Sequence, residues 1–138
     1  MNKDKIFNLF EDSTTIEQHQ KAVAAFNKSY YHKLGMFTKL ILNHFTFHNK
    51  LEKFLKQEEP SYNVESTKEA SAFVVFNRAW SYIKQVDPEN EEAMFTISDF
   101  NPKLLEKTLN SAISHFEEYE EYEKCAHIHK ILQVLKRS

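Results

Sequence analysis

The sequence predicts an all-α protein, a compact bundle or array of about five helices that ends in an αα-hairpin. The first observation is the near absence of helix breakers, since the 138 residues include one Gly and three Pro. The second is the absence of Asn-Gly and Asp-Gly dipeptides, which are typical of β-hairpin turns. The third is an aromatic content of 14%, mostly Phe, which is suited to a helical core. Only short polar stretches interrupt the helical pattern, so we expect residues 1–138 to form a single helical domain.

The N-terminal part of the chain contains two expected helices. Residues 3–10 form an amphipathic segment that must dock on another element, because its length makes it marginal alone. Thr14 and Glu17 have the spacing of a capping box, which predicts a helix that continues through Tyr31. Gly35 is expected to end or kink this helix as a C′ glycine. The alternative keeps Gly35 inside one long helix, at a cost of about 1 kcal/mol.

The middle of the chain predicts two long helices and one short helix. Residues 36–57 are the most apolar helical stretch, and a polar loop follows it. Ser66 and Glu69 form a second capping box, which predicts the start of the next helix. Asp87 and Pro88 end that helix and start a short one, with Asp87 as N-cap and Pro88 at the first helical position.

The C-terminal third predicts two helices joined by a tight acidic turn. Asn101 and Pro102 repeat the start signal before a helix over residues 104–119, and a last helix follows over residues 121–136. The apolar faces of the predicted helices indicate which large side chains are buried. These are Phe45, Leu51, Phe76, Trp80, Ile83, Phe116 and Leu132.

Composition and charge limit the classes of function. The net charge of −2 gives no global attraction to nucleic acid or to an anionic membrane. No apolar run reaches the roughly 18 residues that span a bilayer, and the first residues lack the apolar region of a signal peptide. Cys125 is the single cysteine, which fits a reducing compartment, so we expect a cytoplasmic protein. The richness in Lys, Asn, Ile, Phe and Tyr is typical of AT-rich genomes, such as those of some bacteria and phages.

A histidine stripe is the sharpest feature of the sequence. His44, His48 and Glu52 are four residues apart, and both histidines fall near the middle of the apolar face of their helix. Two imidazoles one turn apart, with a carboxylate a turn further on, have the spacing of a metal site. Two other interpretations stay open, in which the histidines are hydrogen-bonded in the core or partly buried in an interface.

The remaining polar residues give little support to catalysis. His115, Glu123, His127 and His129 gather on a solvated face, where Glu123 and His127 are expected to pair. Cys125 follows several glutamates, which oppose a thiolate, so we expect a packing residue. No residue three before a histidine is Glu, which excludes the di-iron helical motif, and no Gly-rich phosphate loop occurs. We therefore expect no enzyme and no cofactor.

Two tyrosine pairs are candidate contact residues. Tyr30 and Tyr31 stand among basic residues, which suits stacking on single-stranded nucleic acid or, more commonly, the rim of a core. Tyr119 and Tyr122 interrupt the glutamates of residues 117–123, which form a solvated turn or a contact for a basic partner.

The last third also carries a resemblance. Residues 122–132, with the small pair Cys125-Ala126 and later leucines, resemble the second helix of a UVR-type hairpin, although His129 and Lys130 replace its Arg-Asp pair. The same region is similar to one tetratricopeptide unit, with Ile113 in place of the usual glycine. Both resemblances imply a hairpin used for protein–protein contact.

The most favoured interpretation is a non-enzymatic helical protein–protein interaction protein. It is an adaptor, inhibitor, assembly factor or small structural subunit. We expect it to bind a protein partner or to form a homo-oligomer, and not to associate with a membrane. A metal- or ligand-binding bundle built on His44, His48 and Glu52 is the first alternative, and a nucleic-acid accessory protein is the second. The expected partner-binding residues are Tyr30, Tyr31, His44, His48, Tyr119 and Tyr122.

Overall fold

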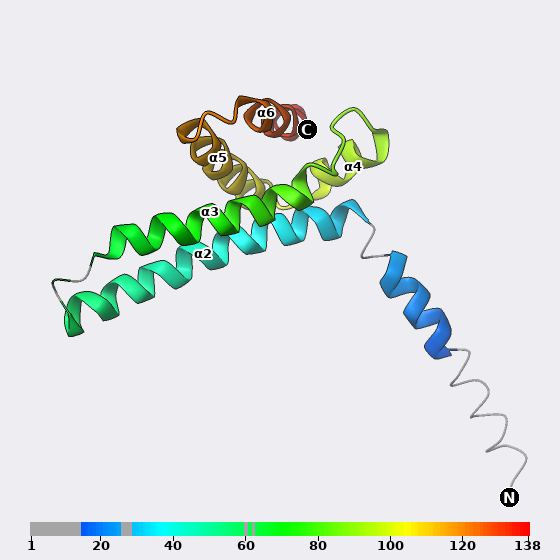
Figure 1. Ribbon diagram of the computed structural model, residues 1–138. Helices are drawn as coiled ribbons and strands as arrows, with labels where there is room; N and C mark the ends of the chain where they lie inside the picture. The colour runs from blue at the N-terminus through cyan, green and yellow to red at the C-terminus, as the bar shows by residue number, and fades with distance from the viewer. Residues whose placement is uncertain (1–14, 26–28, 60, 62) are drawn as a thin grey trace, which may run out of the picture.

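The computed structural model describes residues 15–25, 29–59, 61 and 63–138. In these ranges every regular element is a helix and no strand occurs, so the predicted all-α class is confirmed. Residues 15–25 are helical and exposed along their whole length, whereas Thr14 and the segment 3–10 lie outside the described residues. The labelled helices are α2 (Tyr30–Glu58), α3 (Val64–Ile83), α4 (Glu91–Asp99), α5 (Pro102–Glu118) and α6 (Tyr122–Arg137) (Figure 1).

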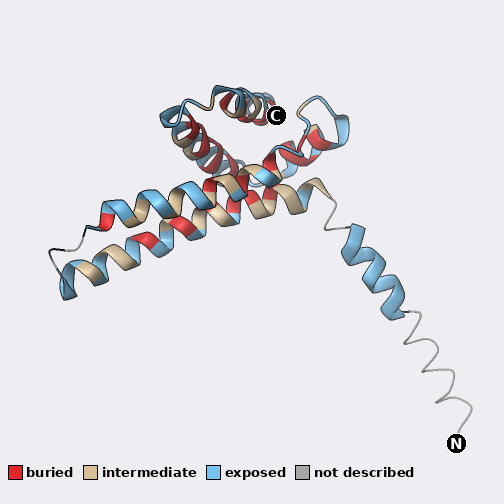
Figure 2. Cartoon of the chain, in the orientation of Figure 1, coloured by how far each residue is buried: buried red, intermediate tan, exposed pale blue. Residues whose placement is uncertain are grey.

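The long helices α2 and α3 form an antiparallel pair, and the other labelled helices cover one part of it (Figure 1). Helices α4, α5 and α6 gather over the start of α2 and the end of α3. The opposite part of the pair projects beyond them as an arm, which we define as residues 47–58 and 64–74. Figure 2 shows that burial concentrates where the five helices meet and fades along the arm. No helix in the described ranges is long and apolar enough to cross a bilayer.

The core joins side chains from all five labelled helices. Phe37 of α2 and Phe116 of α5 are fully enclosed and are the largest residues in it. The predicted burial of four residues is confirmed, namely Phe76, Ile83, Phe116 and Leu132. Phe45, Leu51 and Trp80, which were expected to be largely buried with these four, are less enclosed, because each is only partly buried. Leu51 lies on the arm, beyond the cover of α4–α6, while Phe45 and Trp80 pack at the edge of the core.

The start of α5 was predicted correctly. Asn101 caps the helix, since its Oδ1 accepts a hydrogen bond from Leu104 N at 3.3 Å, and Pro102 occupies the first turn. This pairing satisfies one of the free amides at the helix start, and proline lacks the amide that would go unpaired there.

Two other predicted starts are wrong by a few residues. Helix α3 begins at Val64, where Asn63 Oδ1 accepts from Ser66 N at 3.4 Å, so Ser66 is a helical residue and not the cap. Helix α4 begins at Glu91, and Asn90 is its cap rather than Asp87. In both cases an asparagine, which is among the best N-cap residues, takes the position nearest the first helical turn.

The predicted stop at Gly35 is also wrong. The chain leaves the helical conformation at Ser29 (φ −73°, ψ 157°), whose hydroxyl accepts from His32 N and caps α2. Gly35 lies inside α2, where an added Cβ would meet no atom within 4 Å. Helix α2 is therefore one continuous rod of 29 residues, and its second half forms one side of the arm.

Candidate interaction surface

The turn between α5 and α6 is short and strongly acidic. Glu120 adopts the left-handed conformation (φ 58°), and Glu121 N donates to Phe116 O at 2.9 Å, which closes the reversal. The turn leaves its carboxylates in or near solvent. They belong to Glu117, Glu118, Glu120, Glu121 and Glu123, with no basic residue between them.

Aromatic side chains surround this turn. The Tyr119 ring meets Phe73 of α3 at 5.9 Å and His115 at 4.9 Å between ring centroids. Tyr119 is 44% exposed and Tyr122 63% exposed, so both predicted contact residues are accessible. A hollow of about 400 Å³ opens beside Tyr122 and is lined by residues 120–124. We call the surface of Phe73, Tyr119, Tyr122 and the five glutamates of residues 117–123 the acidic corner.

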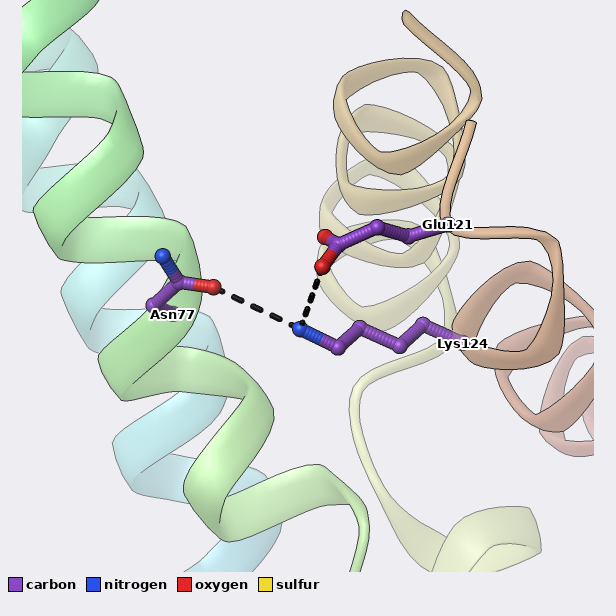
Figure 3. A network of polar contacts seen from close by, with 3 residues as sticks. All are labelled: Asn77, Glu121 and Lys124. Carbon is purple, nitrogen blue, oxygen red and sulfur yellow. Dashed lines mark hydrogen bonds and ion pairs between the residues drawn. The ribbon is translucent and has the colours of Figure 1, made fainter. Parts of the chain in front are cut away.

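Lys124 fixes the acidic corner to α3 (Figure 3). Its Nζ donates to Glu121 Oε1 at 3.1 Å and to Asn77 Oδ1 at 3.5 Å. The same ammonium lies 5.0 Å from the centre of the Phe116 ring, within cation–π range. Glu121 is thereby neutralised from inside the molecule, whereas the other four glutamates of the corner have no ion pair with a described residue.

The histidine stripe of α2 is buried, as predicted. His44 is 6% and His48 3% exposed, and their ring centroids are 4.4 Å apart. His48 Nδ1 is enclosed and has no hydrogen-bond partner among the described residues. The interpretation in which hydrogen bonds satisfy both histidines in the core therefore has no described protein partner at this atom and stays a prediction.

The geometry adds nothing to the metal-site hypothesis for His44, His48 and Glu52. Glu52 directs Oε1 to Lys56 Nζ at 2.9 Å, one turn further along α2. Within the described ranges, no group of three His, Cys, Asp or Glu side chains is arranged to hold a metal ion. The metal site stays a prediction, with two imidazoles close together and a carboxylate already paired.

Burial disfavours the charged form of two histidines, His44 and His115. It lowers the pKa of His44, and the neighbouring His48, Lys68 and His115 lower it further. Burial also lowers the pKa of His115, with Glu118 and Glu121 acting in the opposite direction. The His115 ring stacks on Phe76 at 4.3 Å, so the neutral imidazole behaves as an aromatic core group.

The other candidates of the C-terminal hairpin have structural roles. His127 places Nε2 2.9 Å from Ile83 O of α3, so it turns away from the predicted pairing with Glu123. Cys125 is buried and its Sγ donates to Ile113 O at 3.6 Å, which confirms its predicted packing position. Burial raises the pKa of the Cys125 thiol, and the nearby Glu117 raises it further.

The other tyrosine pair lies against a different helix. Tyr31 donates its hydroxyl hydrogen bond to Asp99 Oδ2, and its ring lies 6.5 Å from that of Phe100. Tyr30 is half-buried against the core, with Lys33 Nζ 5.2 Å from the centre of its ring. Both residues join α2 to the body of the protein and are not part of the acidic corner.

Sequence reasoning missed the apolar surface of the arm. Phe47, Phe54 and Val74 are each more than half exposed. Phe47 and Phe54 are seven residues apart and share a face of α2 beside the histidine stripe, a spacing that was available as a signal. The arm and the acidic corner both present exposed aromatic rings, and the corner also presents exposed carboxylates. Comparisons with protein-family models, with curated proteins and with solved structures find no match to this chain.

Proposed function

We propose that this chain is a non-enzymatic protein–protein interaction protein of the cytoplasm, which docks on its partner through the arm. One observation carries the proposal. Beyond His48 no residue of α2 is buried, and none of α3 is buried between Val64 and Phe76. The arm nevertheless carries Phe47, 60% exposed, and Phe54, 58% exposed.

The energetics of the arm favour a docked partner. A pair of helices without a third element buries little apolar surface and gains little stability from it. Covering one of these phenylalanines contributes about 1.5–3 kcal/mol to the free energy of binding. A partner that covers both therefore gains a substantial share of the binding free energy of a micromolar complex. Aromatic residues are also enriched at the energetic centres of interfaces.

The terminal pair α5 and α6 provides a second surface. The resemblance of this region to UVR-type and tetratricopeptide hairpins implies the same use. An adaptor, which joins two proteins, uses two such surfaces on one body.

Site-specific photocrosslinking in the native cell tests the proposal. A photoreactive phenylalanine analogue replaces Phe54 in one strain and Gln133, an exposed residue of α6, in a matched control. We expect the Phe54 probe to form a crosslink at one defined peptide of a partner, and the second substitution Phe47→Ser to reduce the yield at least about tenfold. Equal yields from both probe positions, or a yield that Phe47→Ser leaves unchanged, would contradict docking through the arm.

A further inference from the structure

The charges of the chain are separated between α2 and the acidic corner. Before its last residue, α2 has a single acidic side chain, Glu52, which is paired with Lys56. Its basic side chains are Lys33, Lys39, Lys50, Lys53 and Lys56. The acidic corner has the opposite character, because four of its glutamates lack an ion pair with a described residue. The α2 face of the arm thus carries exposed lysines beside exposed phenylalanines, whereas the acidic corner carries exposed carboxylates beside exposed rings. The α3 side of the arm has a different character, because Glu65 and Glu69 are exposed there.

We propose that the arm of one copy docks on the acidic corner of a second copy, so that the chains join head to tail. The inference rests on the proposed function and names the partner of its contact surfaces as this same chain. The contact uses the α2 face of the arm, and the occupant follows from charge complementarity between Lys50 and Lys53 on that face and the glutamates of the corner.

The arm offers a strip whose chemistry fits the corner. Phe47, Lys50 and Phe54 follow at intervals of three and four residues, so they lie along one face of α2. All three are exposed, and Lys53 adds a second exposed ammonium next to Phe54. A strip of this kind places a cation between two phenyl rings, one helical turn from each.

The corner offers the matching groups. Tyr119 and Phe73 give apolar ring surface for a phenylalanine of the arm, since exposed rings pack edge to face at low cost. The hollow beside Tyr122 is bordered by the carboxylates of Glu120 and Glu123 and accepts the end of a lysine side chain. The one basic residue of the hollow, Lys124, is already held by Glu121 and Asn77 and does not compete.

Like charges oppose the symmetric alternative. Two arms that met along this strip would bring Lys50 and Lys53 of both copies together, which repel. The contact between arm and corner instead joins two different surfaces and leaves each copy with one free arm and one free corner. Such a contact repeats along an open chain or closes into a ring.

Sedimentation velocity on the purified full chain tests the inference. We expect the weight-average mass to rise with protein concentration, and the apparent affinity to fall about tenfold or more between about 0.05 M and 0.5 M salt. The variant Glu117→Lys with Glu118→Lys and the variant Lys50→Glu with Lys53→Glu should each weaken association at least about tenfold. These residues are exposed, and lysine suits the last turn of α5, so folding is retained. The control Glu89→Lys with Glu106→Lys makes the same charge change at exposed sites elsewhere and should leave association unchanged.

Mixing the two reversed variants gives the decisive result. In the mixture the native arm of the corner variant meets the native corner of the arm variant, and the two reversed surfaces are also of opposite charge, so the mixture should associate to within about threefold of the native affinity although each variant alone is weakened. Two outcomes would overturn the head-to-tail contact. The first is a chain that stays monomeric at every protein and salt concentration. The second is a dimer that survives reversal of the corner charges and is lost with Phe47→Ser. Neither outcome would affect the proposed function, because crosslinking at Phe54 to a different protein would still support it.

Discussion

Replacing His48 by Leu removes a buried polar atom that has no hydrogen-bond partner among the described residues. His48 is 3% exposed, and its Nδ1 is the atom concerned. Leaving a buried donor or acceptor unsatisfied costs about 1–3 kcal/mol. Leucine has a similar volume and no polar atom, and the ring contacts with Phe47 and His44 that it gives up are worth about 0.5–1.5 kcal/mol. We therefore expect a net gain of about 1 kcal/mol in the free energy of unfolding.

Urea denaturation followed by circular dichroism, at about pH 8, measures this gain. For a chain of this length, 1 kcal/mol corresponds to a rise of about 3–5 °C in Tm. The matched control is His129→Leu, at an exposed site of α6, where the change should stay within about 0.5 kcal/mol. A loss of more than about 1 kcal/mol for His48→Leu would refute the reasoning, because it would mean that Nδ1 has a partner, such as a bound water or a metal ion.

Four further predictions concern the body of the protein. The pKa values of His44 and His115 in the folded protein lie below the unfolded value of 6.5, so the unfolded chain binds more protons. The Tm should therefore fall as the pH drops through 6.5. The fall in Tm should be smaller in His44→Leu, which lacks one of the two imidazoles. Trp80→Ala should lower the free energy of unfolding in urea by about 3 kcal/mol, at the low end for tryptophan because the ring is partly exposed. A loss below about 1 kcal/mol would show that the Trp80 ring packs on nothing. Gly35→Ala should raise stability by about 0.5–1 kcal/mol, since the Cβ meets no neighbour, and any loss would contradict a regular helix there. Cys125→Ala should leave partner binding intact, and the native thiol should react slowly with iodoacetamide at neutral pH; rapid alkylation would refute its buried position.

The sequence predicted the helix class and the histidine stripe because both depend on local properties. Few breakers and periodic apolar side chains determine that α2 forms and that His44 and His48 point inward. The cap at Asn101 was also predicted, by asparagine followed by proline, although the similar pair Asp87-Pro88 did not start a helix.

The errors arose where two local signals competed. Asn63 and Ser66 are both favoured N-cap residues, and it is Asn63 whose side chain accepts from Ser66 N and caps α3. Gly35 ends a helix only if it takes a left-handed conformation, and nothing in its neighbourhood forces the chain to turn there. Leu51 shows the larger limit, because periodicity gives the face on which a side chain lies but not whether another helix covers it.

The acidic corner was predictable in part. The run of glutamates with Tyr119 and Tyr122 is contiguous in sequence, whereas Phe73 joins it from α3 through the packing of three helices. Exposure of Phe47 and Phe54 depends on how far α4–α6 extend along the pair, which is a property of the whole fold.

The bare arm has a consequence for local opening. Its amides beyond His48 are held only by helical hydrogen bonds and half-buried contacts, so they exchange with solvent through partial unfolding that leaves Phe37 and Phe116 packed. A partner at one hundred times its Kd raises the free energy of that opening by about 2.7 kcal/mol and slows amide exchange in the arm about a hundredfold. Hydrogen exchange along residues 49–58 thus reports directly whether the arm is occupied.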